Sequence, residues 1–131
     1  MQKTTIAATL AGVIMAVAPA QAQNGANFFD RKTINILVGV SAGGEYDLLA
    51  RLTARHIGNH IPGKPKIIVQ NMTGAGGIVM ANYLYNIAKK DGTYLGAISN
   101  GFQVVQALYP KKIKFDTGKF HFIGAIAPTV E

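Results

Sequence analysis

Cysteine is absent from this 131-residue chain, and long runs of apolar residues are scarce. Without cysteine the fold contains no disulfide and no thiolate metal site, so an ordinary apolar core must stabilise it. The same absence excludes a lipid attached through a cysteine at a signal-peptide junction. Apart from the N-terminal run Ile6–Val17, no segment approaches the roughly 20 apolar residues that a membrane-spanning helix needs.

The first 22 residues have the pattern of a secretory signal peptide. Lys3 supplies a positively charged start, Ile6–Val17 supplies an apolar core, and Ala-Gln-Ala at 20–22 supplies a cleavage site. We therefore expect cleavage after Ala22, a mature chain of residues 23–131, a periplasmic location, and no direct membrane insertion after cleavage. The alternative is that the segment remains as an uncleaved anchor.

Acidic residues are also scarce: 6 Asp and Glu stand against 13 Lys and Arg, a net charge of +7. Such a balance favours anionic partners in general. The cations are scattered, often in pairs such as Lys89-Lys90 and Lys111-Lys112, and no basic run or aromatic RNA-binding motif occurs. Nucleic-acid binding is therefore not predicted.

Strand-like and helix-like segments alternate along the mature chain. We expect strands at Thr33–Val40, Lys66–Asn71, Tyr94–Ser99 and Phe120–Ile126, and helices at Tyr46–His60, Ile78–Lys90 and Phe102–Tyr109. This alternation predicts an α/β fold with right-handed βαβ units on a parallel sheet. In the first helix, Leu49, Leu52 and Ile57 are expected to lie on the buried face.

Three loops of small or polar residues follow the first three strands: Ser41–Asp47, Met72–Gly77 and Ser99–Gly101. Ligands of parallel sheets bind at the carboxyl ends of the strands, where glycine-rich turns before helices offer free N–H groups to anions. We therefore predict a carboxylate site there. Its candidate residues are Ser41, Ala42, Gly43, Gly44, Tyr46, Asp47, Thr73, Gly74, Ala75, Gly76, Ser99 and Asn100. The alternative is that the glycines only allow tight turns and close packing.

The common nucleotide motifs each lack a key residue. A phosphate-binding P-loop needs a lysine after its second glycine, but here Glu45 follows Gly44 and would repel phosphate. A dinucleotide fingerprint needs a third glycine where "GAGGIV" has Val79. No cofactor is therefore expected.

Two sequence patterns could indicate a catalytic or a metal-binding site instead. "GVSAG" at 39–43 matches a nucleophile elbow, so an α/β hydrolase that uses Ser41 is an alternative function. The only histidine beyond the first helix is His121, in a predicted strand. His56 and His60 are four residues apart on a helix, but no third ligand is evident, and no metal is expected.

Asp47 and Arg51 form an i,i+4 pair in the first turns of the predicted helix. Such a pair stabilises a helix by a few tenths of a kcal/mol, roughly. Alternatively, the Asp47 carboxylate fixes the preceding loop by accepting from its backbone N–H groups. Both interpretations remain open at this point.

Several spaced motifs resemble one protein family. They are G-G-x-x-D-x-x-A-R at Gly43–Arg51, H-I-P-G at His60–Gly63, V-Q-N-M-x-G-A-G-G at Val69–Gly77 and K-D-G-T at Lys90–Thr93. Together they closely resemble the periplasmic substrate-binding proteins of tripartite tricarboxylate transporters, the Bug receptors. The resemblance implies a non-catalytic, two-lobed α/β periplasmic binding protein (type II-like). It would close over a small carboxylate and deliver it to membrane permease subunits. It also implies that the first strand–helix loop reaches the ligand carboxylate partly through water.

The chain departs from the family pattern beside the pocket. Val40 and Ser41 stand where the family has an aromatic residue and a proline, and Glu45 stands where a small residue is common. Thr73 and Lys89 replace usual prolines. The resemblance therefore implies that ligand choice differs here.

Family members are much longer than this chain. We therefore expect residues 23–131 to be the first lobe of an incomplete receptor, with most of the second lobe absent. The alternative is a non-functional fragment of a receptor gene.

Overall fold

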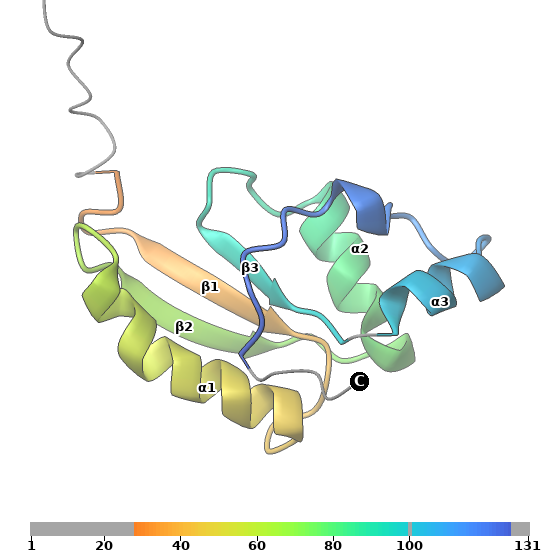
Figure 1. The fold of residues 1–131 in the computed structure, drawn as a ribbon, viewed down its shortest axis with the longest axis horizontal. Coiled ribbons are helices and arrows are strands. Elements are labelled where there is room, and N and C mark those ends of the chain that lie inside the picture. Colours follow the sequence, from red (N-terminus) through yellow and green to blue (C-terminus); the bar gives the residue numbers. More distant parts are fainter. Residues whose placement is uncertain (1–27, 100, 127–131) are drawn as a thin grey trace, which may run out of the picture.

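The computed structural model describes residues 28–99 and 101–126 (Figure 1). Its elements are β1 (Thr33–Val38), α1 (Glu45–Ile57), β2 (Lys66–Asn71), α2 (Ile78–Asn86), β3 (Tyr94–Ala97) and α3 (Phe102–Leu108), with 3-10 turns at Gly58–His60, Ala75–Gly77 and Thr117–Lys119. The predicted signal peptide lies outside the described residues. In the part of the chain that is described, no helix is long and apolar enough to cross a membrane.

The three strands form one parallel sheet in the order β2-β1-β3. Ile36 in the central strand pairs with Val69 on one side and with Leu95 on the other. A strand with neighbours on both edges and helices on both faces has no solvent-facing side, which explains the buried apolar run Ile36–Val38 in β1. The predicted α/β fold class with a parallel sheet is confirmed.

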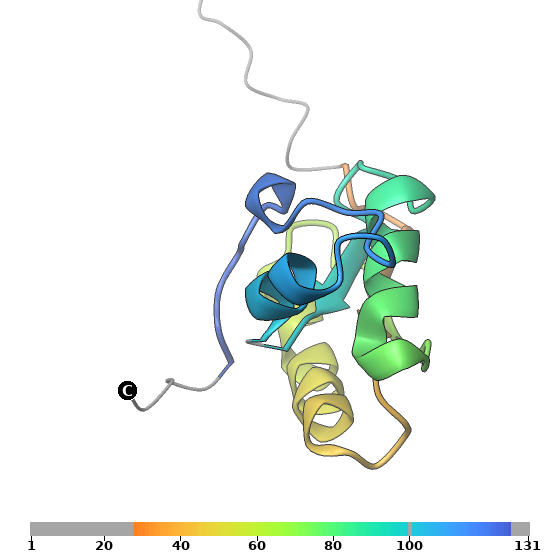
Figure 2. The same cartoon turned by 90° about the vertical axis from the view of Figure 1, so that its right-hand side faces the viewer.

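The two long helices cover opposite faces of the sheet (Figures 1 and 2). Ile36 and Val38 pack with Ala50 of α1. On the other face Gly96 lies so close to α2 that a Cβ there would stand 2.5 Å from Cδ2 of Leu84. The chain runs from β1 to β2 through α1 on one face, and from β2 past β1 to β3 through α2 on the other face. The strand order therefore reverses at a topological switch point between the carboxyl ends of β1 and β3.

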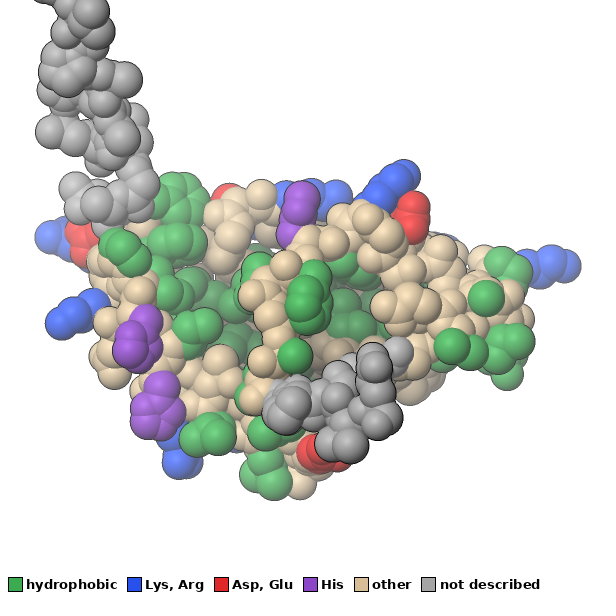
Figure 3. Space-filling model, viewed as in Figure 1, with side chains coloured by type: hydrophobic (Ala, Val, Ile, Leu, Met, Phe, Trp, Pro, Cys, Tyr) green, Lys and Arg blue, Asp and Glu red, His purple; other side chains and the backbone are tan. Residues whose placement is uncertain are grey.

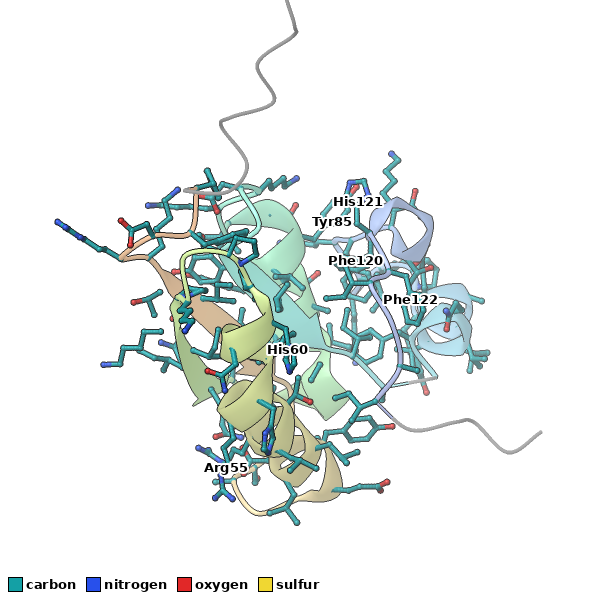
Figure 4. The ribbon with its side chains drawn as sticks, turned by 60° about the vertical axis from the view of Figure 1, so that its left-hand side comes forward. Arg55, His60, Tyr85, Phe120, His121 and Phe122 are labelled. Atoms are coloured by element: carbon teal, nitrogen blue, oxygen red, sulfur yellow. The ribbon has the colours of Figure 1, made fainter. Side chains whose placement is uncertain are left out.

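A second apolar cluster lies over α2 and is built from aromatic rings. Phe102 of α3 stacks on Phe115 at 5.7 Å between ring centroids, and Phe115 is 5.8 Å from Phe120. The Phe120 ring in turn meets Tyr85 of α2 edge-on at 5.6 Å (Figure 4). These contacts hold α3 and the segment after it against α2.

The predicted strand at Phe120–Ile126 is wrong. Within the described residues this segment pairs with no strand, and Phe122 and Ile123 are 84% and 74% exposed. The β preference of a sequence reflects how its side chains pack on a pleated surface with neighbours. This segment has the preferred residues but lacks the neighbouring strand.

β1 and β3 both end two residues earlier than predicted. β1 ends at Val38 instead of Val40, and β3 ends at Ala97 instead of Ser99. In both cases the apolar pattern continues past the point where the backbone turns toward the next helix. The bounds predicted for β2 are confirmed.

Two helix predictions also need correction. α2 ends at Asn86 instead of Lys90; the Asn86 side chain donates to the carbonyl of Lys114, and Ile87 leaves helical geometry with φ −120°. In α1, Leu52 is 50% exposed and does not lie on the buried face. That face is centred on Asp47 and Ala50 instead, because the preceding loop sets the rotation of the helix.

Candidate functional site

The three predicted loops meet at the switch point of the sheet. They enclose a cavity of about 10 Å³, roughly the space of one water molecule. Its lining consists of Gly39, Val40 and Tyr46 from the first connection, Gly76, Gly77 and Met80 from the second, and Ala97, Ser99 and Phe102 from the third. None of these side chains is charged. The strand ends therefore converge as the topology predicted.

Two glycines are needed where the first two loops touch. A Cβ on Gly39 would lie 2.6 Å from Cα of Gly77, closer than real Cβ atoms approach other atoms. Gly77 has φ +90°, and a Cβ on it would lie 3.1 Å from Cζ of Phe102. For these two positions the packing role of glycine is established. Sequence reasoning missed them as site residues because each lies far from the other along the chain.

The loop after β2 presents a run of backbone N–H groups. Gly74, Ala75, Gly76 and Gly77 all have positive φ, with values of 143°, 46°, 63° and 90°. The Gly77 N–H donates to the carbonyl of Gly74 at 2.9 Å. Among the described residues, the N–H groups of Gly74, Ala75 and Gly76 have no acceptor. Successive donors in a left-handed turn form a concave site suited to an anion.

The loop after β1 offers fewer free donors than the sequence suggested. The Gly43 N–H donates to Oδ2 of Asp47 at 2.8 Å, and the Gly44 N–H donates to the carbonyl of Ser41 at 3.3 Å. The Leu48 N–H donates to the carbonyl of Gly44 at 2.9 Å. Within the described residues, the N–H groups of Ala42 and of Glu45–Asp47 have no acceptor. These groups, aided by the helix dipole, are the ones that remain for an anion.

Asp47 is buried beneath this loop, with only 1% of its surface exposed. Its carboxylate accepts from Nε of Arg51 at 2.9 Å, from the Gly43 N–H at 2.8 Å and from Nδ2 of Asn71 at 2.9 Å. These donors, with the Arg51 bond foremost, hold the pKa of Asp47 well below its usual range, and the carboxylate stays ionised. Both interpretations of the Asp47–Arg51 pair are therefore correct: it is a helical ion pair, and it fixes the loop.

Asn71 joins this network from the end of β2. Its Nδ2 also donates to the carbonyl of Val40 at 3.0 Å, and its Oδ1 accepts from Nη2 of Arg51 at 3.0 Å. Sequence reasoning did not select Asn71. The available signal was a polar residue that ends a strand directly before a glycine-rich loop.

The remaining predicted site residues divide into two groups. Tyr46 and Ser99 are half-buried and line the cavity. Ser41, Ala42 and Thr73 are exposed and do not line it, and Asn100 lies outside the described residues. Of the predicted site residues, Tyr46, Gly76 and Ser99 thus line the cavity.

Charge near the site is sparse. Glu45 is exposed in the first turn of α1, while Arg51 is already bound to Asp47 and Asn71. Lys and Arg side chains are dispersed around the outline of the face in Figure 3 and form no single basic patch there. An anion at the described loops would therefore be held by backbone donors.

Within the described residues, no hydrogen bond joins a histidine to Ser41. His121 follows Phe120, which packs on Tyr85 in the last turn of α2 (Figure 4), whereas Ser41 lies in the connection between β1 and α1. His60 ends the 3-10 turn after α1. No group of three or more potential metal-binding side chains occurs among the described residues.

Comparison with known proteins finds a relative of this chain. The chain is 36% identical over 114 residues to the "UPF0065 protein in gbd 5'region" of Cupriavidus necator. The match covers 87% of this chain and 33% of that protein, so the chain spans about a third of the length of the curated relative. No protein-family model matches the chain.

Proposed function

We propose that the chain belongs to a solute receptor of the Bug type, a non-enzymatic protein that binds a small carboxylate. The observation that carries this proposal is the meeting of three strand-end loops at the switch point, with backbone N–H groups left unpaired on two of them. Similarity to a UPF0065 protein, the family designation of Bug-type proteins, supports it.

The chemistry of the loops favours a carboxylate held without a cationic side chain. Its oxygens accept from the N–H groups of Gly74–Gly76, of Ala42 and of Glu45–Asp47. The cavity below has room for about one water, which can bridge the ligand to Ser99 or to backbone groups. Binding of this kind orients the ligand and performs no chemistry on it.

The proposal includes a location and a partner. The predicted signal peptide directs the protein to the periplasm, where it would deliver its ligand to the membrane permease subunits of a tripartite tricarboxylate transporter. The match covers only 33% of the relative, which agrees with a receptor whose second lobe closes over the ligand and completes its contacts.

Calorimetric titration of the whole gene product tests the proposal. The panel is succinate, citrate and benzoate, which represent dicarboxylates, tricarboxylates and aromatic acids. The corresponding neutral amides are the matched controls, since they keep the shape and lose the charge. Binding of at least one acid, with its amide much weaker, is the expected result. If none of the three acids binds, the proposal is wrong.

A second candidate is an α/β hydrolase that uses Ser41. The observation in its favour is the "GVSAG" sequence between β1 and α1, with Ser41 exposed. Replacement of Ser41 by alanine separates the two functions. Ester hydrolysis would disappear in the variant. Carboxylate binding through backbone N–H groups stays within about twofold of the original affinity, since the Ser41 hydroxyl makes no hydrogen bond within the described residues.

A further inference from the structure

We propose that Asn71 is a positioning residue, which holds the two glycine-rich loops in a fixed relation and so pre-arranges their N–H groups for a carboxylate. This inference rests on the proposed function for its consequence in binding. Its structural part concerns how the loops are held and stands on hydrogen bonds already described.

The position of Asn71 in the chain is the first argument. Asn71 is the last residue of β2, and the next residue, Met72, anchors the start of the second loop through its N–H bond to the carbonyl of Val38 at 2.8 Å. The side chain of Asn71 reaches instead to the first loop, at the carbonyl of Val40. One residue thus begins one loop and holds the other.

The second argument is that both polar atoms of the Asn71 amide form hydrogen bonds. Nδ2 donates to Val40 and to Asp47, and Oδ1 accepts from Arg51. Only one orientation of the amide satisfies all three partners, because two are acceptors and one is a donor. Asn71 is an exposed residue, and ordering an exposed side chain costs entropy. Three simultaneous bonds offset that cost.

The effect on Asp47 is the third argument. Oδ2 of Asp47 accepts from Gly43 and Arg51, whereas Asn71 is the protein donor to Oδ1 within the described residues. Without Asn71 a buried carboxylate oxygen loses its donor, which is unfavourable away from water. We expect the carboxylate to turn toward solvent and to weaken its bond to the Gly43 N–H, which loosens the first loop.

The experiment compares Asn71→Ala with Gln70→Ala in the whole gene product. Gln70 is the neighbouring exposed residue on β2, and its amide makes one long bond, 3.4 Å, to Oδ1 of Asn35. Amide hydrogen exchange is measured first, without any acid present. In Asn71→Ala, exchange at Gly43 and its neighbours should be faster by about tenfold or more, while Gln70→Ala resembles the original protein.

Titration with succinate, citrate and benzoate follows, at a temperature where circular dichroism shows each variant to be folded. The acid that binds the original protein should bind Asn71→Ala about tenfold more weakly, which corresponds to about 1.4 kcal/mol. Gln70→Ala should bind it unchanged.

The outcomes separate the two proposals. Unchanged exchange in Asn71→Ala overturns the positioning role. Faster exchange with an unchanged Kd also overturns it, since Asn71 would then be merely structural. If none of the acids binds the original protein, the proposed function fails, and the exchange data alone decide whether Asn71 holds the loops.

Discussion

Gly39 and Gly77 come from different connections of the chain and meet at the carboxyl edge of the sheet, where a Cβ on Gly39 would lie 2.6 Å from Cα of Gly77. The two backbones touch because the loop after β1 and the start of α2 both turn at the switch point. Glycine-rich sequence at this edge therefore serves two purposes. Gly39 and Gly77 permit contact between the loops, while Gly74 and Gly76 leave N–H groups free.

Gly39→Ala should destabilise the fold by about 1–3 kcal/mol, because the added methyl group must push backbone apart. The measurement is urea unfolding followed by circular dichroism. Gly118→Ala is the matched control, since a Cβ there meets only Oδ1 of Asp116 at 3.4 Å, an ordinary contact. Equal stability of the two variants would contradict the close approach of the loops.

Stability should fall as the pH drops below about 4, and Asp47 should carry much of that loss. The pKa of Asp47 is depressed in the folded state, so its contribution is complete above the unfolded-state pKa and is lost as the pH falls toward the folded one. Asp91, whose pKa is lowered by bonds from the hydroxyl and N–H of Thr93, adds in the same direction.

The check is the melting temperature from pH 7 to pH 2 for Asp47→Asn and for Asp30→Asn. Asp47→Asn should melt about 5–10 °C lower at pH 7 and show a shallower decline in acid. Asp30 is exposed and far from the loops, so its variant should follow the original curve. A parallel decline in all three proteins would show that the Asp47 network adds little.

Asn71→Asp should damage the network more than Asn71→Ala does at neutral pH. The introduced carboxylate has no N–H groups and would face both the carbonyl of Val40 and the carboxylate of Asp47. Protonation gives the new group one donor again, so its melting temperature, measured relative to Asn71→Ala, should rise as the pH is lowered from 7 to 4. A constant difference over this range would contradict the geometry at Asp47.

Phe102→Ala should cost about 3–5 kcal/mol, since the ring is buried against Phe115 and closes one side of the cavity beside Gly77. Val104 is 60% exposed on the same helix, and Val104→Ala should stay within about 0.5 kcal/mol of the original. Urea unfolding of both variants decides the matter. A small effect of Phe102→Ala would mean that α3 is not part of the cooperative core.

The amino-acid sequence predicted the α/β fold and the convergence of the three loops, because both follow from alternation and from a topological rule. The bounds of β2 were correct because Pro65 precedes a short run of β-branched residues. The contacts that shape the site were not predictable in this way. Asn71 meets Val40, and Gly39 meets Gly77, only after the sheet order is fixed, and no local pattern encodes that order.

The failed strand at Phe120–Ile126 has a similar explanation. Its residue types favour extended backbone, but a β-strand also needs a neighbouring strand to pair with. The segment has no hydrogen-bonded partner strand within the described residues, and local preference alone did not form one.

The central place of β1 has a kinetic consequence. Its residue Asn35 pairs with Ile68 on one edge and with Tyr94 on the other, so both pairings are distant in sequence. The entropic cost of closing a chain loop grows with the length of the loop. We therefore expect such pairings to form only after the intervening helices have shortened the chain. We expect β1, α1 and β2 to assemble first and to serve as a template on which β3 is added. β1 comes first among the described strands, yet its second edge is covered only when β3 is added.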